Sequence, residues 1–157
     1  MLHLLLHQPQ IAPNTGNLIR LCANTGCQLH LIEPLGFTLD DKRLRRAGLD
    51  YHEWARVERH RDFDEFLQRL ASPPRIYAFS TRAQRCYSTV SYQPDDVLLF
   101  GSETQGLPDE LLARLPTQQQ LRLPMQPGSR SLNLANAAAI ALYEAWRQLG
   151  FAGGRPA

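Results

Sequence analysis

The stretch LRLPMQPGSRSLNLANAAAIALYEAWRQL, residues 121–149, decides the fold. Its apolar start, residues 121–123, predicts a short strand, and a loop rich in proline, glycine and serine follows. From Leu134 the apolar residues recur at the i, i+3, i+4 and i+7 spacing of a helix with one buried face. Gly150 lies just past this pattern, where a helix often ends. The stretch therefore predicts a strand, a loop and a long C-terminal helix.

This segment is either an ordinary connection or a loop that holds a ligand. Ser131, Asn133 and Asn136 gather where the helix is predicted to begin. The first N–H groups of a helix lack partners within it, so they need acceptor atoms from side chains or from a ligand. This crowding of polar residues favours the ligand-binding loop.

The rest of the chain alternates predicted strands and helices. Asn14 or Thr15 is expected to cap the first helix, and Asp62 a later one. We expect strands at residues 2–6, 29–32, 55–57, 76–79 and 97–100, and helices at about 14–24, 40–48, 63–70 and 108–115. This alternation predicts an α/β fold with a mostly parallel sheet flanked by helices. We expect one domain over residues 1–157, with about 151–157 as a loose tail.

Three predicted strands end beside residues suited to a binding site. Phe79, Gly101 and Leu123 lie at these ends, and α/β sheets bind ligands at the carboxyl ends of their strands. Gly101 and Gly106 lie five residues apart directly after a strand, so the backbone there must turn sharply or approach another group closely.

The composition is that of an ordinary globular protein. The chain has 157 residues, of which 43% are hydrophobic and 20% charged, and no run approaches the roughly 18 apolar residues of a membrane span. The start MLHLLLHQPQ is short and lacks a basic segment, so we expect no signal peptide. The cysteines, Cys22, Cys27 and Cys86, have no metal-ligand spacing and suit structural thiols in a reducing compartment. We therefore expect a cytoplasmic protein with no membrane partner.

The basic residues are almost all arginines. Lys42 is the one lysine among 17 basic residues, and Arg43, Arg45 and Arg46 follow it directly. Guanidinium groups match phosphate geometry well, which is consistent with an RNA partner. The alternative is a codon bias that places arginines on a solvated surface, and the net charge of +2 does not separate the two interpretations.

Several common chemistries find no motif in this sequence. Gly101 and Gly106 have the glycine spacing of a phosphate loop, but Leu107 and Pro108 stand where its lysine and hydroxyl residue belong. A nucleotide hydrolase at this loop is therefore disfavoured. No cluster of His, Cys or Asp has metal-ligand spacing, and no nucleophile has an evident base. We expect no metal.

Three segments, taken together, resemble a known family. They are PNTGNLIR at residues 13–20, LFGSETQGLP at 99–108, and residues 123–137, from LPM to SLNLANA. They resemble the three motifs of the SPOUT superfamily of knotted RNA methyltransferases, in its TrmH-like 2'-O-methylating branch. Residues 20–26, 41–52 and 143–147 are similar to the small single-domain members of this branch that methylate the wobble nucleotide of tRNA. The resemblance spans essentially the whole chain.

The resemblance implies a fold, a cofactor and a partner. It implies a deep C-terminal trefoil knot, S-adenosylmethionine bound within it, S-adenosylhomocysteine as product, and a homodimer. The implied cofactor pocket comprises Phe79, Gly101, Leu123 and Ser131, with Met125 and Leu132 nearby. The implied catalytic residues, around the reacting ribose, are Asn17, Arg20, Glu103, Ser131 and Asn133.

The implied reaction transfers a methyl group to the ribose 2'-hydroxyl of the wobble nucleotide, a cytidine or modified uridine in the anticodon loop, in leucine tRNAs. The protein must position the hydroxyl and ease removal of its proton. Mechanisms described for the family often give this proton to the arginine of the first motif, here Arg20. Because a guanidinium stays protonated in proteins, our hypothesis is that Arg20 binds the phosphate beside the target ribose, while a phosphate oxygen or water accepts the proton.

RNA contacts are expected from Arg43, Arg45 and Arg46 and from Tyr143 or Trp146, because a single domain has no added RNA-binding module. For Tyr143 the alternative is packing on an amphipathic helix.

Two rival functions stay open: a 2'-O-methyltransferase of ribosomal RNA or another tRNA position, and a non-catalytic RNA-binding protein that holds the cofactor as a structural ligand.

Overall fold

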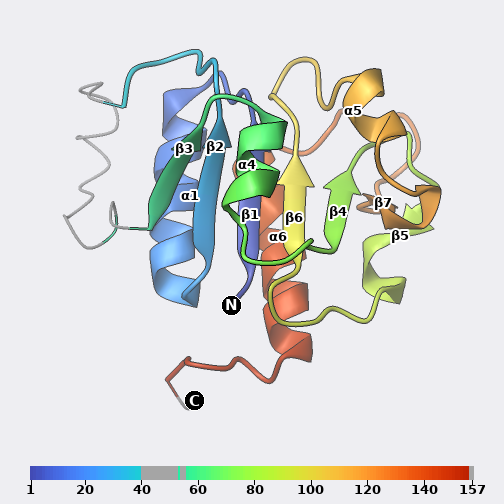
Figure 1. Cartoon of the computed structure of the whole chain (residues 1–157). Helices are drawn as coiled ribbons and strands as arrows, with labels where there is room; N and C mark the ends of the chain where they lie inside the picture. The colour runs from blue at the N-terminus through green and yellow to red at the C-terminus, as the bar shows by residue number, and fades with distance from the viewer. Residues whose placement is uncertain (40–52, 54–55, 156–157) are drawn as a thin grey trace.

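A parallel sheet forms the centre of the computed structural model, which describes residues 1–39, 53 and 56–155 (Figure 1). Within this part of the chain, seven strands pair in parallel in the order β3-β2-β1-β6-β4-β7-β5. Their bounds are β1 His3–His7, β2 Gln28–Ile32, β3 Val57–His60, β4 Ile76–Phe79, β5 Arg85–Cys86, β6 Val97–Phe100 and β7 Gln120–Arg122. The expected α/β class and parallel sheet are confirmed.

Helices cover both faces of this sheet, as the alternation of strands and helices requires. In Figure 1, α4 lies in front of the strands, and α1 and α6 lie behind them. The helices are α1 Ala12–Thr25, α4 Phe63–Arg69, α5 Asp109–Ala113 and α6 Leu134–Gln148, with short 3-10 turns at Tyr87–Thr89 and Thr117–Gln119. The two central strands, β1 and β6, are therefore covered on both sides.

Alternate residues of the central strands build two separate cores. Leu4 and Leu6 of β1 pack with α1 and α6, whereas Leu5 packs with Phe66 of α4 and with Leu99 of β6. Successive side chains of a strand point to opposite faces, so a strand covered on both sides reads as a continuous apolar run. This is why HLLLH and VLLF are recognisable as buried strands in the sequence.

The helix start at α1 differs from the prediction. Neither Asn14 nor Thr15 caps the helix: it begins at Ala12, its N-cap is Ile11, and both predicted cap residues are buried in the first turn. The acceptors for this helix start come from Glu103, 92 residues away in sequence, so local sequence could not reveal them.

The third strand also differs. β3 covers Val57–His60, whereas we expected residues 55–57, and the two share only Val57. Glu58 and Arg59 are exposed on this edge strand, so its sequence lacks the apolar run that marks a buried strand. The predicted helix at 40–48 lies outside the described residues, and the two-residue β5 was not predicted.

The end of α6 agrees with the prediction, but the tail does not behave as expected. Gly150 has a φ of 66°, the left-handed conformation that ends many helices. Beyond it, the indole Nε1 of Trp146 donates to the carbonyl of Ala152 at 3.0 Å, and Phe151 contacts the Trp146 ring edge-on. Residues 151 and 152 are thus held against α6 rather than loose. No helix in the described part of the chain is long and apolar enough to cross a membrane.

Candidate functional site

Two adjoining pockets open at the carboxyl ends of β4, β6 and β7, with volumes of about 410 and 770 Å³. Both are lined by Phe79, Phe100, Ser131 and Leu132. Leu123 and Met125 line the smaller pocket, and Gly101 lines the larger one. The structure therefore brings together all six residues of the predicted cofactor pocket, although they come from three segments far apart in the chain.

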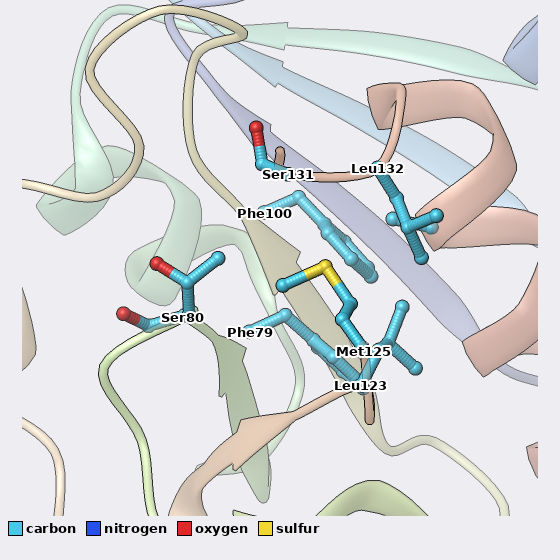
Figure 2. Close-up of a pocket in the computed structure, with 9 residues that line it drawn as sticks. Phe79, Ser80, Phe100, Leu123, Met125, Ser131 and Leu132 are labelled. Carbon is cyan, nitrogen blue, oxygen red and sulfur yellow. The ribbon is translucent and has the colours of Figure 1, made fainter. Parts of the chain in front are cut away.

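The smaller pocket has an aromatic and aliphatic wall. The rings of Phe79 and Phe100 stack with centroids 4.5 Å apart and planes 9° from parallel. Figure 2 shows Met125 pointing into the space beside these rings, with Leu123 and Leu132 next to it. Ser80 and Ser131 add hydroxyl groups at the rim. Such a pocket suits a flat apolar group that also needs a few hydrogen bonds.

The loop after β6 forms one side of the larger pocket, and two glycines allow its shape. Gly106 has a φ of 68°, and its N–H donates to the carbonyl of Ser102 at 3.0 Å. A Cβ atom on Gly101 would lie 2.0 Å from the carbonyl carbon of Gly106. The backbone at Gly101 therefore packs against the far end of its own loop, and no side chain fits between them.

A chain of hydrogen bonds joins this loop to the starts of both long helices. The Glu103 carboxylate accepts from the backbone N–H groups of Gln10 at 2.7 Å and Ile11 at 3.0 Å, and from the Asn14 amide at 3.1 Å. The Asn14 carbonyl oxygen in turn accepts from the Asn133 amide at 2.9 Å. We call Glu103, Asn14 and Asn133 the carboxamide clasp. It connects the three sequence motifs through side chains.

Asn133 has a second task in this clasp. Its Oδ1 accepts from the backbone N–H groups of Ala135 at 2.9 Å and Asn136 at 3.3 Å, which makes it the N-cap of α6. Because Leu132 and Ser131 directly precede this cap, the cap fixes the direction in which the pocket loop enters the helix.

Asn17 and Arg20 lie elsewhere. Both are exposed on α1, and neither is among the described residues that line the two pockets. The Nε of Arg20 contacts Glu53 Oε1 at 3.1 Å. The structure thus brings Glu103, Ser131 and Asn133 to the pocket side of the molecule and leaves Asn17 and Arg20 on the outer surface of α1.

The predicted RNA contacts divide in the same way. Arg43, Arg45 and Arg46 lie outside the described residues. Tyr143 is 46% exposed on α6, and its ring meets Trp146 edge-on at 5.6 Å. The tyrosine is therefore available on the surface, and the packing interpretation explains only part of its environment.

Sequence reasoning missed two residues of this region. Asn14 was interpreted as a helix cap, and Phe100 was assigned only to a strand. The signal for Phe100 was its position: it ends β6 in register with Phe79 of β4, so both rings emerge on the same face.

A further polar pocket beside the site is lined by His7, Gln8 and Arg82, and burial lowers the pKa of His7.

The model of the SpoU rRNA Methylase family matches residues 1–143. This chain belongs to that family. A tRNA (cytidine(34)-2'-O)-methyltransferase of Yersinia pestis is 60% identical over 157 residues, covering 98% of this chain and 97% of the relative. These matches confirm the family expected from the three motifs.

Solved structures agree with this assignment. A structure described as "Structural insights into the 2-OH methylation of C/U34 on tRNA" superposes with a TM-score of 0.87 at 47% identity, covering 96% of this chain and 97% of that one. An AdoMet-bound rRNA methyltransferase from Sinorhizobium meliloti superposes with a TM-score of 0.81 at 28% identity. It covers 94% of this chain and 56% of that chain.

Proposed function

We propose that this chain transfers the methyl group of S-adenosylmethionine to the ribose 2'-hydroxyl of nucleotide 34, the wobble nucleotide of tRNA. The observation that carries the proposal is the convergence of the six predicted cofactor residues on adjoining pockets at the carboxyl edge of the sheet. Relatives of nearly the same length, at 55–60% identity, are named tRNA (cytidine(34)-2'-O)-methyltransferases.

The residues present fit this cofactor. The stacked Phe79 and Phe100 rings, with Leu123 and Leu132, form the apolar wall that an adenine ring requires. The Gly101 loop brings backbone N–H and C=O groups to the larger, more polar pocket, where ribose and amino-acid groups need partners. When bound, the cofactor supplies an electrophilic methyl group on a positively charged sulfur. The protein's own task is to hold the target hydroxyl in line with that methyl group.

The carboxamide clasp is proposed to position rather than to react. Both oxygens of the Glu103 carboxylate, and both the amide nitrogen and the carbonyl oxygen of the Asn14 side chain, form hydrogen bonds within the protein. These bonds hold the start of α1, the Gly101 loop and the start of α6 in one arrangement. Ser131 has its hydroxyl at the pocket rim and is proposed to contact the ribose or the cofactor.

Arg20 is proposed to bind the phosphate next to the target ribose, with Asn17 beside it on the same face of α1. Its guanidinium contacts the Glu53 carboxylate on the outer surface of the helix. RNA or a second subunit must therefore extend over this face for Arg20 to act at the pocket. A phosphate oxygen or water, rather than the guanidinium, would then accept the proton.

A homodimer is proposed to form across the outer faces of α1 and α6. These helices pack against each other behind the sheet, and Ile140 on α6 and Ile11 before α1 are more than 40% exposed. Apolar side chains grouped on one face favour an interface.

A trefoil knot in which α6 passes through a preceding loop is proposed on the resemblance, as are the single-domain organisation and a cytoplasmic location.

The substrate is proposed to be a cytidine or modified uridine of leucine tRNAs, held through Arg43, Arg45, Arg46 and Tyr143. The deciding experiment incubates the purified protein with methyl-labelled S-adenosylmethionine and either total tRNA or ribosomal RNA. We expect label in tRNA alone. Label in ribosomal RNA would move the proposal to another RNA, and cofactor binding without any transfer would leave the non-catalytic RNA-binding role.

A further inference from the structure

Three histidines form a continuous row across the strands at the far edge of the sheet. His3 Nδ1 lies 2.9 Å from His30 Nε2, and His30 Nδ1 lies 3.0 Å from His60 Nε2. His3 belongs to β1, His30 to β2 and His60 to β3. His30 and His60 are 2% and 1% exposed. The methyl-transfer site proposed above uses none of these residues.

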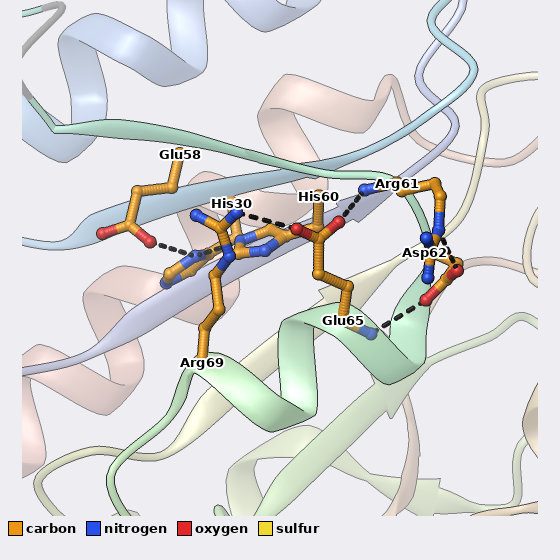
Figure 3. A network of polar contacts seen from close by, with 7 residues as sticks. All are labelled: His30, Glu58, His60, Arg61, Asp62, Glu65 and Arg69. Carbon is orange, nitrogen blue, oxygen red and sulfur yellow. Dashed lines mark hydrogen bonds and ion pairs between the residues drawn. The ribbon is translucent and has the colours of Figure 1, made fainter.

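A carboxylate completes a group of three metal-ligating side chains here. Glu58 and His60 are residues i and i+2 of β3, so their side chains leave the strand on the same face. His30 of β2 is the cross-strand partner of Glu58. One donor atom from each of His30, Glu58 and His60 lies within 4.8 Å of the others, and Glu58 Oε2 is 3.8 Å from His30 Nδ1. Figure 3 shows these three side chains converging beneath α4.

We propose that His30, Glu58 and His60 bind a divalent transition-metal ion, with Zn²⁺ as the best match, that links β2 to the edge strand β3. Two imidazoles and a carboxylate are a common zinc ligand set, and bond lengths of about 2.0–2.2 Å separate tetrahedral ligands by about 3.3 Å. The observed separation of 3.0 Å between the two ring nitrogens and 3.8 Å to the carboxylate bracket this value.

The surroundings fit a bound cation in three ways. His30 has its second nitrogen against His3, which provides the outer hydrogen bond that orients most metal-bound histidines. Phe66 of α4 contacts both the His30 and His60 rings edge-on and fixes their planes. The Glu58 side chain is 47% exposed, so water can reach the site as a fourth ligand.

Metal binding also fixes where the two ring protons lie. A metal between His30 Nδ1 and His60 Nε2 takes the place of their hydrogen bond, and each neutral ring then carries its proton on its other nitrogen, which for His30 is Nε2, facing His3. His60 Nδ1, the nitrogen that points away from His30, is buried without a hydrogen-bond partner.

The neighbouring charges do not prevent binding. Arg69 lies over the site in Figure 3, but its guanidinium is paired with Glu65 at 2.7 Å. The pair adds no net charge, and Glu58 adds a negative one. Sequence spacing alone could not indicate this site, because the third ligand comes from a strand 30 residues away.

The test uses the full chain, stripped of metal with a chelator and titrated with Co²⁺ and Zn²⁺. We expect one Co²⁺ per chain, with the strong visible absorption of a tetrahedral site and no thiolate band, displaced by Zn²⁺. Glu58→Gln, which changes an exposed strand residue, should weaken binding at least tenfold, whereas Glu58→His should retain it. Glu110→Gln, an exposed glutamate on α5, is the matched control and should leave binding unchanged.

The same titration contains the contradicting results. Absence of saturable binding, binding that Glu58→Gln leaves unchanged, or a thiolate band from Cys22 or Cys27 would each overturn the proposal. Methyl transfer is measured in parallel, with and without chelator, and we expect no change. Failure of the metal site therefore leaves the proposed methyltransferase function untouched, and the reverse also holds.

Discussion

At the scale of single residues, Gly101 shows how closely the pocket loop is packed. Gly101 and Gly106 belong to one loop but are required for different reasons: Gly101 has no room for a Cβ atom, whereas Gly106 has room but a positive φ. The sequence predicted that both were special. It could not say which of them lies against backbone, because that depends on how the loop closes.

These two glycines give a matched pair of variants. Gly101→Ala should weaken binding of S-adenosylhomocysteine by at least a hundredfold, because the new methyl group displaces the loop backbone. Gly106→Ala should weaken it less, because backbone strain alone costs about 1–2 kcal/mol. Isothermal titration calorimetry measures both, with circular dichroism to confirm folding. Equal affinities for Gly101→Ala and the natural protein would contradict this account of the pocket.

Arg20 offers a second test at this scale, one that separates phosphate binding from proton transfer. Arg20→Lys keeps a positive charge but loses the planar fork, so methyl transfer should fall roughly tenfold to a few hundredfold, or about 1.5–3 kcal/mol. The pH-rate profile should keep its shape. A new basic limb near the ordinary lysine pKa would instead assign a general-base role to this position.

At the scale of elements, the start of α1 depends on a side chain that is distant in the sequence. The Glu103 carboxylate takes two backbone N–H groups at this helix start, and Asn14 links it to the cap of α6. Sequence analysis predicted α1, α4, β4, β6 and α6 well because each has a clear apolar period or a local cap. It was wrong about the cap of α1 because the acceptor lies 92 residues away.

Glu103→Gln tests whether the clasp holds these elements together. The amide keeps one acceptor oxygen but places an NH₂ group against the donors of the other, and the negative charge is lost, so the free energy of unfolding should fall by about 1.5–3 kcal/mol in urea titrations. The KM for S-adenosylmethionine should rise as the Gly101 loop loosens. Glu110→Gln serves as the control on an exposed helix, and equal stability of the two variants would show that the clasp does not position the loop.

At the scale of the whole molecule, the two ends of the sheet differ in chemistry. The carboxyl ends of the strands carry the pocket, and the β1-β2-β3 edge carries the row of His3, His30 and His60, of which His30 and His60 are buried. Burial lowers the pKa of all three rings. The charged groups that act on the row are Asp95 and the N-terminal amine beside His3, Glu58 on β3, and the paired Glu65 and Arg69 on α4.

This row makes stability depend on pH. Below about pH 6.5 the histidines of the unfolded chain bind protons that the buried rings of the folded protein do not bind. The free energy of unfolding is therefore highest above that pH and falls as the pH decreases toward 3. Between pH 7.5 and 4.5, His30 alone should reduce the free energy of unfolding by about 3 kcal/mol. Urea unfolding in chelator at a series of pH values measures this. A flat profile, or the same slope in His30→Gln, would contradict it.

The prediction for the whole molecule was confirmed where strands have a clear apolar run, and the residue pattern contained no information on contacts between distant segments. The class, the parallel sheet and the convergence of Phe79, Gly101 and Leu123 follow from strand ends that share one edge. The sequence did not indicate that Asn17 and Arg20 lie outside the pocket. An exposed polar stripe on α1 has the same residue pattern whether or not it faces the site.

The most direct test of the central claim is to map the modified nucleotide. The purified protein is incubated with unmodified tRNA and S-adenosylmethionine, and nuclease fragments are analysed by mass spectrometry. We expect a single added methyl group on the ribose of nucleotide 34, and none when that nucleotide carries a 2'-deoxyribose. A methyl group on a base or at another position, or transfer to the 2'-deoxy substrate, would contradict it.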